Sequence, residues 1–264
     1  MLMDVIDYQI YGDDMQFVEI ELDPGEAAIG EAGTMFYMED GIQMETIFGD
    51  GSASQSGIFG KLLGAGKRLV TGESLFTTVF MNAGSGKKKV AFSAAYPGKI
   101  IPVNLAQMGG TLLCQKDAFL CAAKGVSLGI AFQKKLGAGF FGGEGFILQK
   151  LEGDGHAFIH AGGAIIEKNL QPGERLRVDT GCVVAFTQDI DFDIQYVGGI
   201  KTALFGGEGI FFATLTGPGK VWMQSLPLSR LANRIVGASH IGGGKGAEQG
   251  SVLGGIGNLF ENDR

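Results

Sequence analysis

Three glutamates, each preceded by a glycine, are the residues of this chain whose types and spacing could do chemistry together: Glu73, Glu144 and Glu208. Two of them lie in a stretch that occurs twice, FGGEG, at 141–145 and 205–209. If three such segments met at a threefold axis, their carboxylates would share a proton or hold a cation. Away from an axis, each carboxylate would accept hydrogen bonds from the amides of its own glycine turn. We expect this structural role and keep the converged carboxylate site as the alternative.

Two glycine-rich stretches have phosphate-loop spacing but lack the parts that hold a phosphate. GAGFFG, at 137–142, matches G-x-G-x-x-G, yet a strand-like run rather than a helix follows it, so no helix N-terminus would meet a pyrophosphate. In GKLLGAGKR, five residues separate Gly60 from Gly66, and Arg68 stands where a Ser or Thr would hold Mg²⁺. We therefore expect neither a nucleotide nor another cofactor.

The histidines and cysteines do not form a catalytic or metal-binding pattern. His156 and His160 are four apart in a predicted strand, which separates their Cα atoms by about 13 Å, too far for easy shared ligation of one metal ion. We interpret them as residues of a turn exit and of a polar face. Cys114, Cys121 and Cys182 each lie among apolar residues, which predicts buried free thiols in a reducing compartment. With no nucleophile beside a base, we expect no catalytic residue and no enzyme.

The composition is that of a folded, acidic protein. Of the 264 residues, 45% are hydrophobic, and 21 Lys and Arg against 28 Asp and Glu give a net charge of −7. An acidic surface repels a phosphate backbone, so general binding of nucleic acid is disfavoured. The acidic N-terminus lacks the basic start of a signal peptide, and no apolar run has the roughly 18 residues of a membrane span. We expect a cytoplasmic protein.

The segments that would position these residues repeat three times along the chain. Two recurring signals are a Pro-Gly pair before Glu or Lys and a later Gly-x-Gly turn, beginning at Pro24, Pro97, Pro172 and at Gly84, Gly153, Gly217. The runs around the later turns, such as GFILQKLEG and HAFIHA, are β-branched and aromatic, which predicts hairpins entered through a glycine bend. Each Pro-Gly pair predicts a turn followed by a strand, because Pro fixes φ at the first corner and Gly takes the positive φ of the second.

These patterns predict an all-β fold of three tandem modules at 1–95, 96–170 and 171–236, packed side by side with approximate threefold symmetry. The i, i+3, i+4 spacing of apolar residues from Leu228 to Val236 predicts one helix at 227–236, with Gly237 just past its end. A glycine-rich tail follows at 237–264, which either docks on a partner or stays disordered.

Several segments resemble an uncharacterised bacterial family whose eukaryotic relatives are named for altered inheritance of mitochondria. The segments are FGGEGIFFATLTGPGKVWMQSLPLSRLA (205–232), FGGEGFILQKLEGDGHAFIHAGGAI and LQPGERLRVDTGCVVAF. The resemblance covers roughly 16–232. It implies a triplicated β fold, similar to the trp RNA-binding attenuation protein and described as a double-stranded β-helix. It implies no enzyme activity at any position of this sequence. It also implies a role near membrane organisation.

We therefore predict a non-enzymatic scaffold or partner-binding protein that forms a homo-oligomer through its exposed strand edges. A small-ligand-binding β-barrel is the first alternative, since such modules can enclose apolar pockets. RNA binding, by analogy with the attenuation protein, is a second alternative that the negative charge opposes. Contact of the 237–264 tail with a membrane surface is a third.

Overall fold

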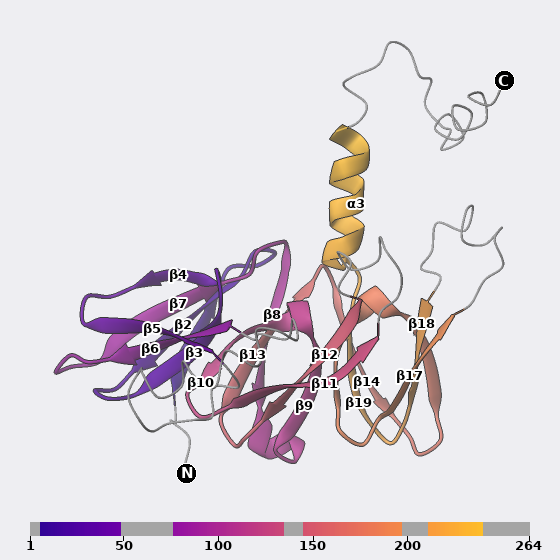
Figure 1. Ribbon diagram of the computed structural model, residues 1–264, viewed down its shortest axis with the longest axis horizontal. Helices are drawn as coiled ribbons and strands as arrows, with labels where there is room; N and C mark the ends of the chain where they lie inside the picture. The colour runs from indigo at the N-terminus through magenta and orange to yellow at the C-terminus, as the bar shows by residue number, and fades with distance from the viewer. Residues whose placement is uncertain (1–5, 49–75, 135–144, 197–210, 240–264) are drawn as a thin grey trace. The chain divides into compact units, whose positions relative to one another are not determined.

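The computed structural model describes residues 6–48, 76–134, 145–196 and 211–239, and it confirms an all-β fold with one helix (Figure 1). Contacts divide the chain into two units, Met1–Ser229 and Arg230–Arg264. The first unit holds every described strand. The insertion predicted near 52–70 and the tail after residue 239 lie outside the described residues.

The described strands fall into three groups of six, preceded by β1 (Asp7–Tyr11). The first group is β2 (Phe17–Leu22), β3 (Ala27–Glu31), β4 (Met35–Met38), β5 (Ile42–Phe48), β6 (Phe76–Asn82) and β7 (Lys88–Ser93). The second is β8 (Gly98–Asn104), β9 (Thr111–Gln115), β10 (Phe119–Ala123), β11 (Ser127–Lys134), β12 (Phe146–Glu152) and β13 (His156–Gly162). The third is β14 (Ile165–Leu170), β15 (Arg175–Asp179), β16 (Val183–Thr187), β17 (Asp191–Tyr196), β18 (Phe211–Thr216) and β19 (Gly219–Gln224).

The same antiparallel pairing scheme occurs in all three groups. The sixth strand pairs with the first and the third, and the fifth strand pairs with the second and the fourth. The pairing of the third strand with the sixth has a register irregularity at the same place each time, at 35/37, 119/121 and 183/185. The predicted module limits stay a prediction, although β14, which lies within 96–170, pairs with β19 of the third group.

Consecutive groups are joined through two specific strands. The second strand of one group pairs with the third strand of the next, as β3 with β10 and β9 with β16. Four sheets result, with the orders β1-β2-β7-β4, β5-β6-β3-β10-β13-β8, β11-β12-β9-β16-β19-β14 and β15-β18-β17. We call them the first to fourth sheets.

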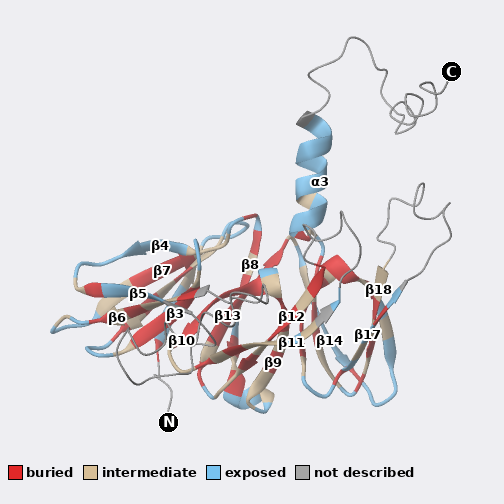
Figure 2. Ribbon diagram, in the orientation of Figure 1, coloured by how far each residue is buried: buried red, intermediate tan, exposed pale blue. Residues whose placement is uncertain are grey.

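A hydrophobic core lies between each pair of successive sheets. One core joins the first sheet to the second, where Phe80 of β6 meets Phe92 of β7 edge-on at 5.2 Å. The central core joins the second and third sheets and contains Trp222, the single tryptophan of the chain. The third core joins the third and fourth sheets around Phe146 and Phe186. The second and third sheets are therefore covered on both faces, and their strands carry most of the buried residues in Figure 2.

The hairpins predicted around the Gly-x-Gly turns are wrong. The turns at Gly153 and Gly217 do connect strands, β12 to β13 and β18 to β19, but the two strands of each pair belong to different sheets. The alternation of apolar residues suits a strand packed on either sheet, and sequence alone does not say which sheet a strand joins. The turns therefore carry the chain across a hydrophobic core rather than back along one sheet.

Two of the three predicted Pro-Gly turns are confirmed. Gly25 and Gly173 have φ of 90° and 79°, and each turn is closed by a glutamate, Glu26 or Glu174, whose carboxylate accepts the backbone N–H of the residue three before it at 2.8 Å. The prediction at Pro97-Gly98 is wrong. Gly98 begins β8 in an extended conformation, and a Cβ there would meet the Ala161 carbonyl oxygen at 2.0 Å, so this glycine permits close approach of two strands instead of a turn.

The helix among the described residues is longer than predicted. α3 spans Leu228–Ser239, so Gly237 lies within it and does not end it. A glycine inside a helix costs only about 1 kcal/mol relative to alanine, which the rest of a regular helix tolerates. Its apolar residues include Leu228, Ile235 and Val236, which are exposed within the described residues.

Candidate functional site

The glutamates of the predicted carboxylate site lie outside the described residues. Glu73, Glu144 and Glu208 fall in 49–75, 135–144 and 197–210, so both their convergence and their local turn role stay predictions. Gly145, which closes the first FGGEG, has φ of 84°, a conformation that glycine adopts at low cost. In the four described ranges, no three His, Cys, Asp or Glu residues are placed to hold a metal ion.

The placement of His160 on a polar face is wrong, because its side chain is only 3% exposed. Burial lowers the pKa of His160 to about 4, against a weaker hydrogen bond that the imidazole donates to the backbone of Tyr96, which raises it. Its Nε2 makes no hydrogen bond to any described residue. Gln224, at the corresponding place in the third group, is also buried but accepts from the Gly162 amide and donates to the Gly181 carbonyl. His160 is therefore a neutral imidazole in the fold.

Glu31 is a titratable residue that the sequence reading did not select. It ends β3 in a half-buried position, where burial and the nearby Asp117 raise its pKa to about 7, while Lys116 lowers it. Burial, together with the carboxylates of Asp117 and Glu31, raises the pKa of Tyr96 to about 12. A signal was present in AAIGE, where one acid closes an apolar run. Glu31 can hold a proton near neutral pH, and Tyr96 links this acidic region to His160.

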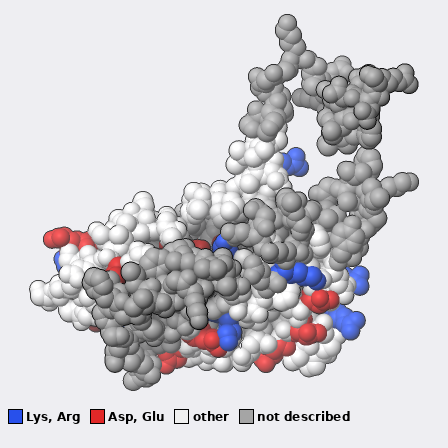
Figure 3. All heavy atoms as spheres, in the orientation of Figure 1, with Lys and Arg blue, Asp and Glu red and all other residues white. Residues whose placement is uncertain are grey.

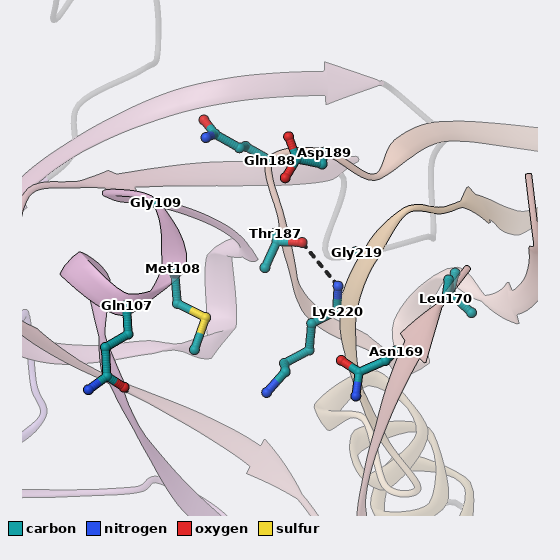
Figure 4. A pocket seen from close by; sticks show the side chains of 10 residues that line it. All are labelled: Gln107, Met108, Gly109, Asn169, Leu170, Thr187, Gln188, Asp189, Gly219 and Lys220. Carbon is teal, nitrogen blue, oxygen red and sulfur yellow. Dashed lines mark hydrogen bonds between the residues drawn. The ribbon is translucent and has the colours of Figure 1, made fainter. Parts of the chain in front are cut away.

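A surface hollow of about 470 Å³ lies beside the third group (Figure 4). Its lining includes Asp189, Asn169 and Lys220, and the Lys220 amide donates to the Thr187 hydroxyl at 3.0 Å. The Lys220 ammonium is already paired with Glu167 at 2.7 Å, and it also lies 5.4 Å from the Trp222 ring. Because this charge is committed to a neighbouring side chain, the hollow offers little for an anionic ligand.

The most unusual surface in the described residues is β4, whose sequence is MFYM. All four residues are exposed, and Phe36 reaches 56% (Figure 2). Phe36 and Tyr37 each pack edge-on against Phe17, which also stacks on Tyr11 at 5.0 Å. The Tyr37 hydroxyl donates to Glu19, which also binds Lys89 at 2.7 Å. These contacts hold an aromatic surface along the strand.

The strands that correspond to β4 in the other groups are buried. All five residues of β10 and the first four of β16 are buried, and β3 and β9 pair with the outer edges of these strands. β4 pairs with β7 alone, and no described strand covers its other edge. An uncovered edge with no charge or proline among its strand residues presents free backbone N–H and C=O groups to another strand.

At the other end of the series of sheets, the edge strand of the fourth sheet is β15, the second strand of the third group. It pairs with β18, and no strand in the described ranges lies on its other edge. Arg175 and Arg177 are exposed on it, while Val178 is buried. On the face drawn in Figure 3, the acidic and basic side chains of the described residues are interspersed, so neither sign forms a continuous patch there.

The strand order and the described surfaces define a class of protein: an antiparallel all-β protein of several packed sheets with an uncovered strand at each end of the series. Comparison with known proteins gives the family. Residues 8–226 match the family described as mitochondrial biogenesis AIM24, and the chain belongs to it.

Two similar proteins come from Streptococcus pyogenes. An uncharacterised protein of serotype M6 is 31% identical over 226 residues, which is 84% of this chain and 86% of that protein. A protein of the same species with a crystal structure is similar in fold, with a TM-score of 0.69, 25% identity, and coverage of 88% of this chain and 99% of the other. The predicted family is thereby confirmed, and its bacterial relatives include a protein without an assigned function.

The described helix is too short and too polar to cross a membrane. None of the three cysteines forms a disulfide. Cys114 and Cys121 are buried as predicted, whereas the predicted burial of Cys182 is wrong, because this residue is only half-buried. Burial raises the pKa of the Cys114 and Cys121 thiols, which keeps them in the unreactive protonated form.

Proposed function

We propose that this protein is a non-enzymatic scaffold that acts by binding a partner along the uncovered edge of β4. The observation that carries the proposal is the exposed apolar strand Met35–Met38, at a position where both corresponding strands are covered by a neighbouring strand. Adding a strand to such an edge supplies backbone hydrogen bonds, and the aromatic side chains supply apolar contact area.

One other edge strand with an exposed apolar residue, β14, carries charges that oppose this kind of pairing. In β14, which is also an edge strand, the side chain of Ile166 is 54% exposed, but the charged residues Glu167 and Lys168 follow Ile166 within the same strand. Charges on an edge strand discourage pairing with another chain. β4 has no such residue between Met35 and Met38, which supports its assignment as the binding edge.

A matched pair of variants tests the proposal. Phe36→Lys places a charge on the β4 edge, and Ile166→Lys places the same charge at a similarly exposed apolar position on β14. Tagged wild-type protein and both variants are used to recover bound proteins from the cells that make the chain. We expect Phe36→Lys to lose what the wild-type protein and Ile166→Lys retain. Equal recovery by both variants would remove β4 from the account.

A link to membrane organisation forms a second part of the proposal, supported by the description of the family as mitochondrial biogenesis proteins. Liposome flotation of the full chain and of a chain ending at residue 236 tests it. Flotation of the full chain alone would support contact through 237–264. Absence of both from the liposome fraction would argue against a membrane surface.

A further inference from the structure

We propose that the strand that covers β4 is β15 of a second copy of the same chain. The inference rests on the proposed function of β4 as a binding edge and names its partner. The strands of the second and third sheets follow one order. Each sheet begins with the fourth, fifth and second strands of one group and continues with the third, sixth and first strands of the next group.

The first and fourth sheets are the two halves of that same order. The fourth sheet, β15-β18-β17, contains the fourth, fifth and second strands of the last group, and it stops at β15. The first sheet contains the third, sixth and first strands of the first group, extended by β1, and it stops at β4. Joining β15 of one copy to β4 of the next would complete a sheet with the order already present twice within the chain.

The internal junctions also give the register of the new one. Cys121, the first residue of β10 after the register irregularity, lies opposite Gly30, the fourth residue of β3. Ala185, at the same place in β16, lies opposite Cys114, the fourth residue of β9. The corresponding residues at the open ends are Tyr37 of β4 and Val178 of β15. The antiparallel junction therefore places Tyr37 opposite Val178, and Met38 opposite Arg177.

Charge complementarity supports this pairing. Arg175 and Arg177 are exposed on β15, and Glu39 and Asp40 follow directly after β4. In the inferred register, Asp40 comes opposite Arg175, one position beyond the residues that pair at the internal junctions. Opposite charges across an antiparallel pair stabilise it, whereas two copies of β4 would bring only acidic residues together.

The contact joins two different surfaces, so it is heterologous and leaves each added copy with one open end. Such contacts close into rings or extend into filaments, according to the rotation between copies. A twofold dimer would require the same surface on both copies, whereas this contact joins β4 of one copy to β15 of the other. The inferred assembly is therefore head-to-tail.

Single cysteines on separate chains test the junction. Cross-strand partners have Cα atoms about 4.5–5.5 Å apart, within the range that a disulfide spans. In a Cys182→Ser background, Tyr37→Cys protein is mixed with Val178→Cys protein under mild oxidation and separated by mass without reductant. Because each chain carries one new thiol, the hetero-pair can link only between copies. The control mixes Tyr37→Cys with Arg175→Cys, which is about 10 Å out of register.

We expect a disulfide-linked species of twice the chain mass from Tyr37→Cys with Val178→Cys and only background linkage from the control. Equal linkage in both mixtures would overturn the register, and no linkage in either would overturn the pairing of copies. A link that forms only within a chain carrying both cysteines would also overturn it. If copies do not link while Phe36→Lys still loses a bound protein, the proposed function stands and its partner is another protein.

Discussion

The Tyr96 ring lies edge-on against the His160 imidazole, with the ring centroids 4.5 Å apart and the planes inclined at 78°. Both side chains are buried, and His160 lies on β13, which pairs with β8 and β10 in the second sheet. At the corresponding place in the third group, Gln224 has two polar partners, whereas His160 contacts an aromatic ring. We therefore expect the stability of the protein to depend on pH.

The first prediction concerns His160→Gln. The pKa of His160 is about 4 in the fold and near 6.5 in an unfolded chain, so between these values only the unfolded chain binds the proton. The stability contributed by neutral His160 is therefore present above pH 6.5 and is lost as pH falls towards 4, by up to about 3 kcal/mol. We expect the wild-type protein to lose stability relative to His160→Gln over this range. Denaturant unfolding followed by Trp222 fluorescence measures the difference, and parallel pH profiles would contradict it.

The second prediction, for Glu31→Gln, has the opposite sign. The pKa of Glu31 is raised to about 7 from 4.5, so between these values only the folded chain holds the proton. Stability from this group is present below pH 4.5 and is lost as pH rises through 7, by at most about 3 kcal/mol. Glu31→Gln should therefore gain stability relative to the wild-type protein as pH rises from 5 to 8. A constant difference between the two proteins across that range would show that Glu31 is ionised in the fold.

The third prediction concerns Gly98. A Cβ at this position would lie 2.0 Å from the Ala161 carbonyl oxygen and 2.6 Å from His160 Nε2, so β8 and β13 must separate to admit it. We expect Gly98→Ala to destabilise the protein by about 2 kcal/mol or more, which is typical of overpacking. Gly129→Ala in β11 is the control, because nothing lies within 4 Å of its added Cβ. Thermal unfolding should show a lowered midpoint for Gly98→Ala alone, and equal midpoints would refute the close approach.

The fourth prediction concerns the thiols. Cys114 and Cys121 are buried, and the pKa values of their thiols are raised. Cys182 is half-buried and ends the short 3-10 helix between β15 and β16. A thiol reagent at pH 8 should modify one cysteine of the native protein within the time in which all three react in denaturant. Mass spectrometry of the intact protein gives the count, and peptide mapping should place the modification at Cys182. Rapid modification of Cys121 would mean that the second sheet opens readily.

Sequence patterns predicted the all-β class of the fold and two of its Pro-Gly turns, because strand length, turns and glycine spacing depend on local chemistry. The Pro24-Gly25 and Pro172-Gly173 turns are local features of this kind. The sheet membership of β12 and β13 could not be predicted, since it depends on which distant strand each one meets. The burial of His160 was missed for the same reason: its polar character suggested a solvated face, and only the packing of Tyr96 and β8 shows otherwise.

The residues of the proposed interface were also hard to select from the sequence. MFYM reads as an ordinary buried strand, and its corresponding strands FLCAA and VVAFT are indeed buried. What distinguishes β4 is its place at the beginning of the series, where no preceding group supplies a covering strand. The prediction of a homo-oligomer stays a prediction, now attached to a specific pair of strands.

The most direct test of the head-to-tail pairing places like charges opposite each other at the inferred junction and then restores an opposite pair. Met38→Lys places a lysine opposite Arg177, and like charges directly opposite each other destabilise a strand pair. Adding Arg177→Glu to the same chain restores an attractive pair at every head-to-tail contact. The measurement is molar mass by light scattering for the wild-type protein, Met38→Lys, and Met38→Lys with Arg177→Glu. We expect an assembly of several chains for the wild-type protein, a loss of mass for the single variant and recovery for the double variant. A wild-type mass equal to one chain, or an unchanged mass for Met38→Lys, would contradict it.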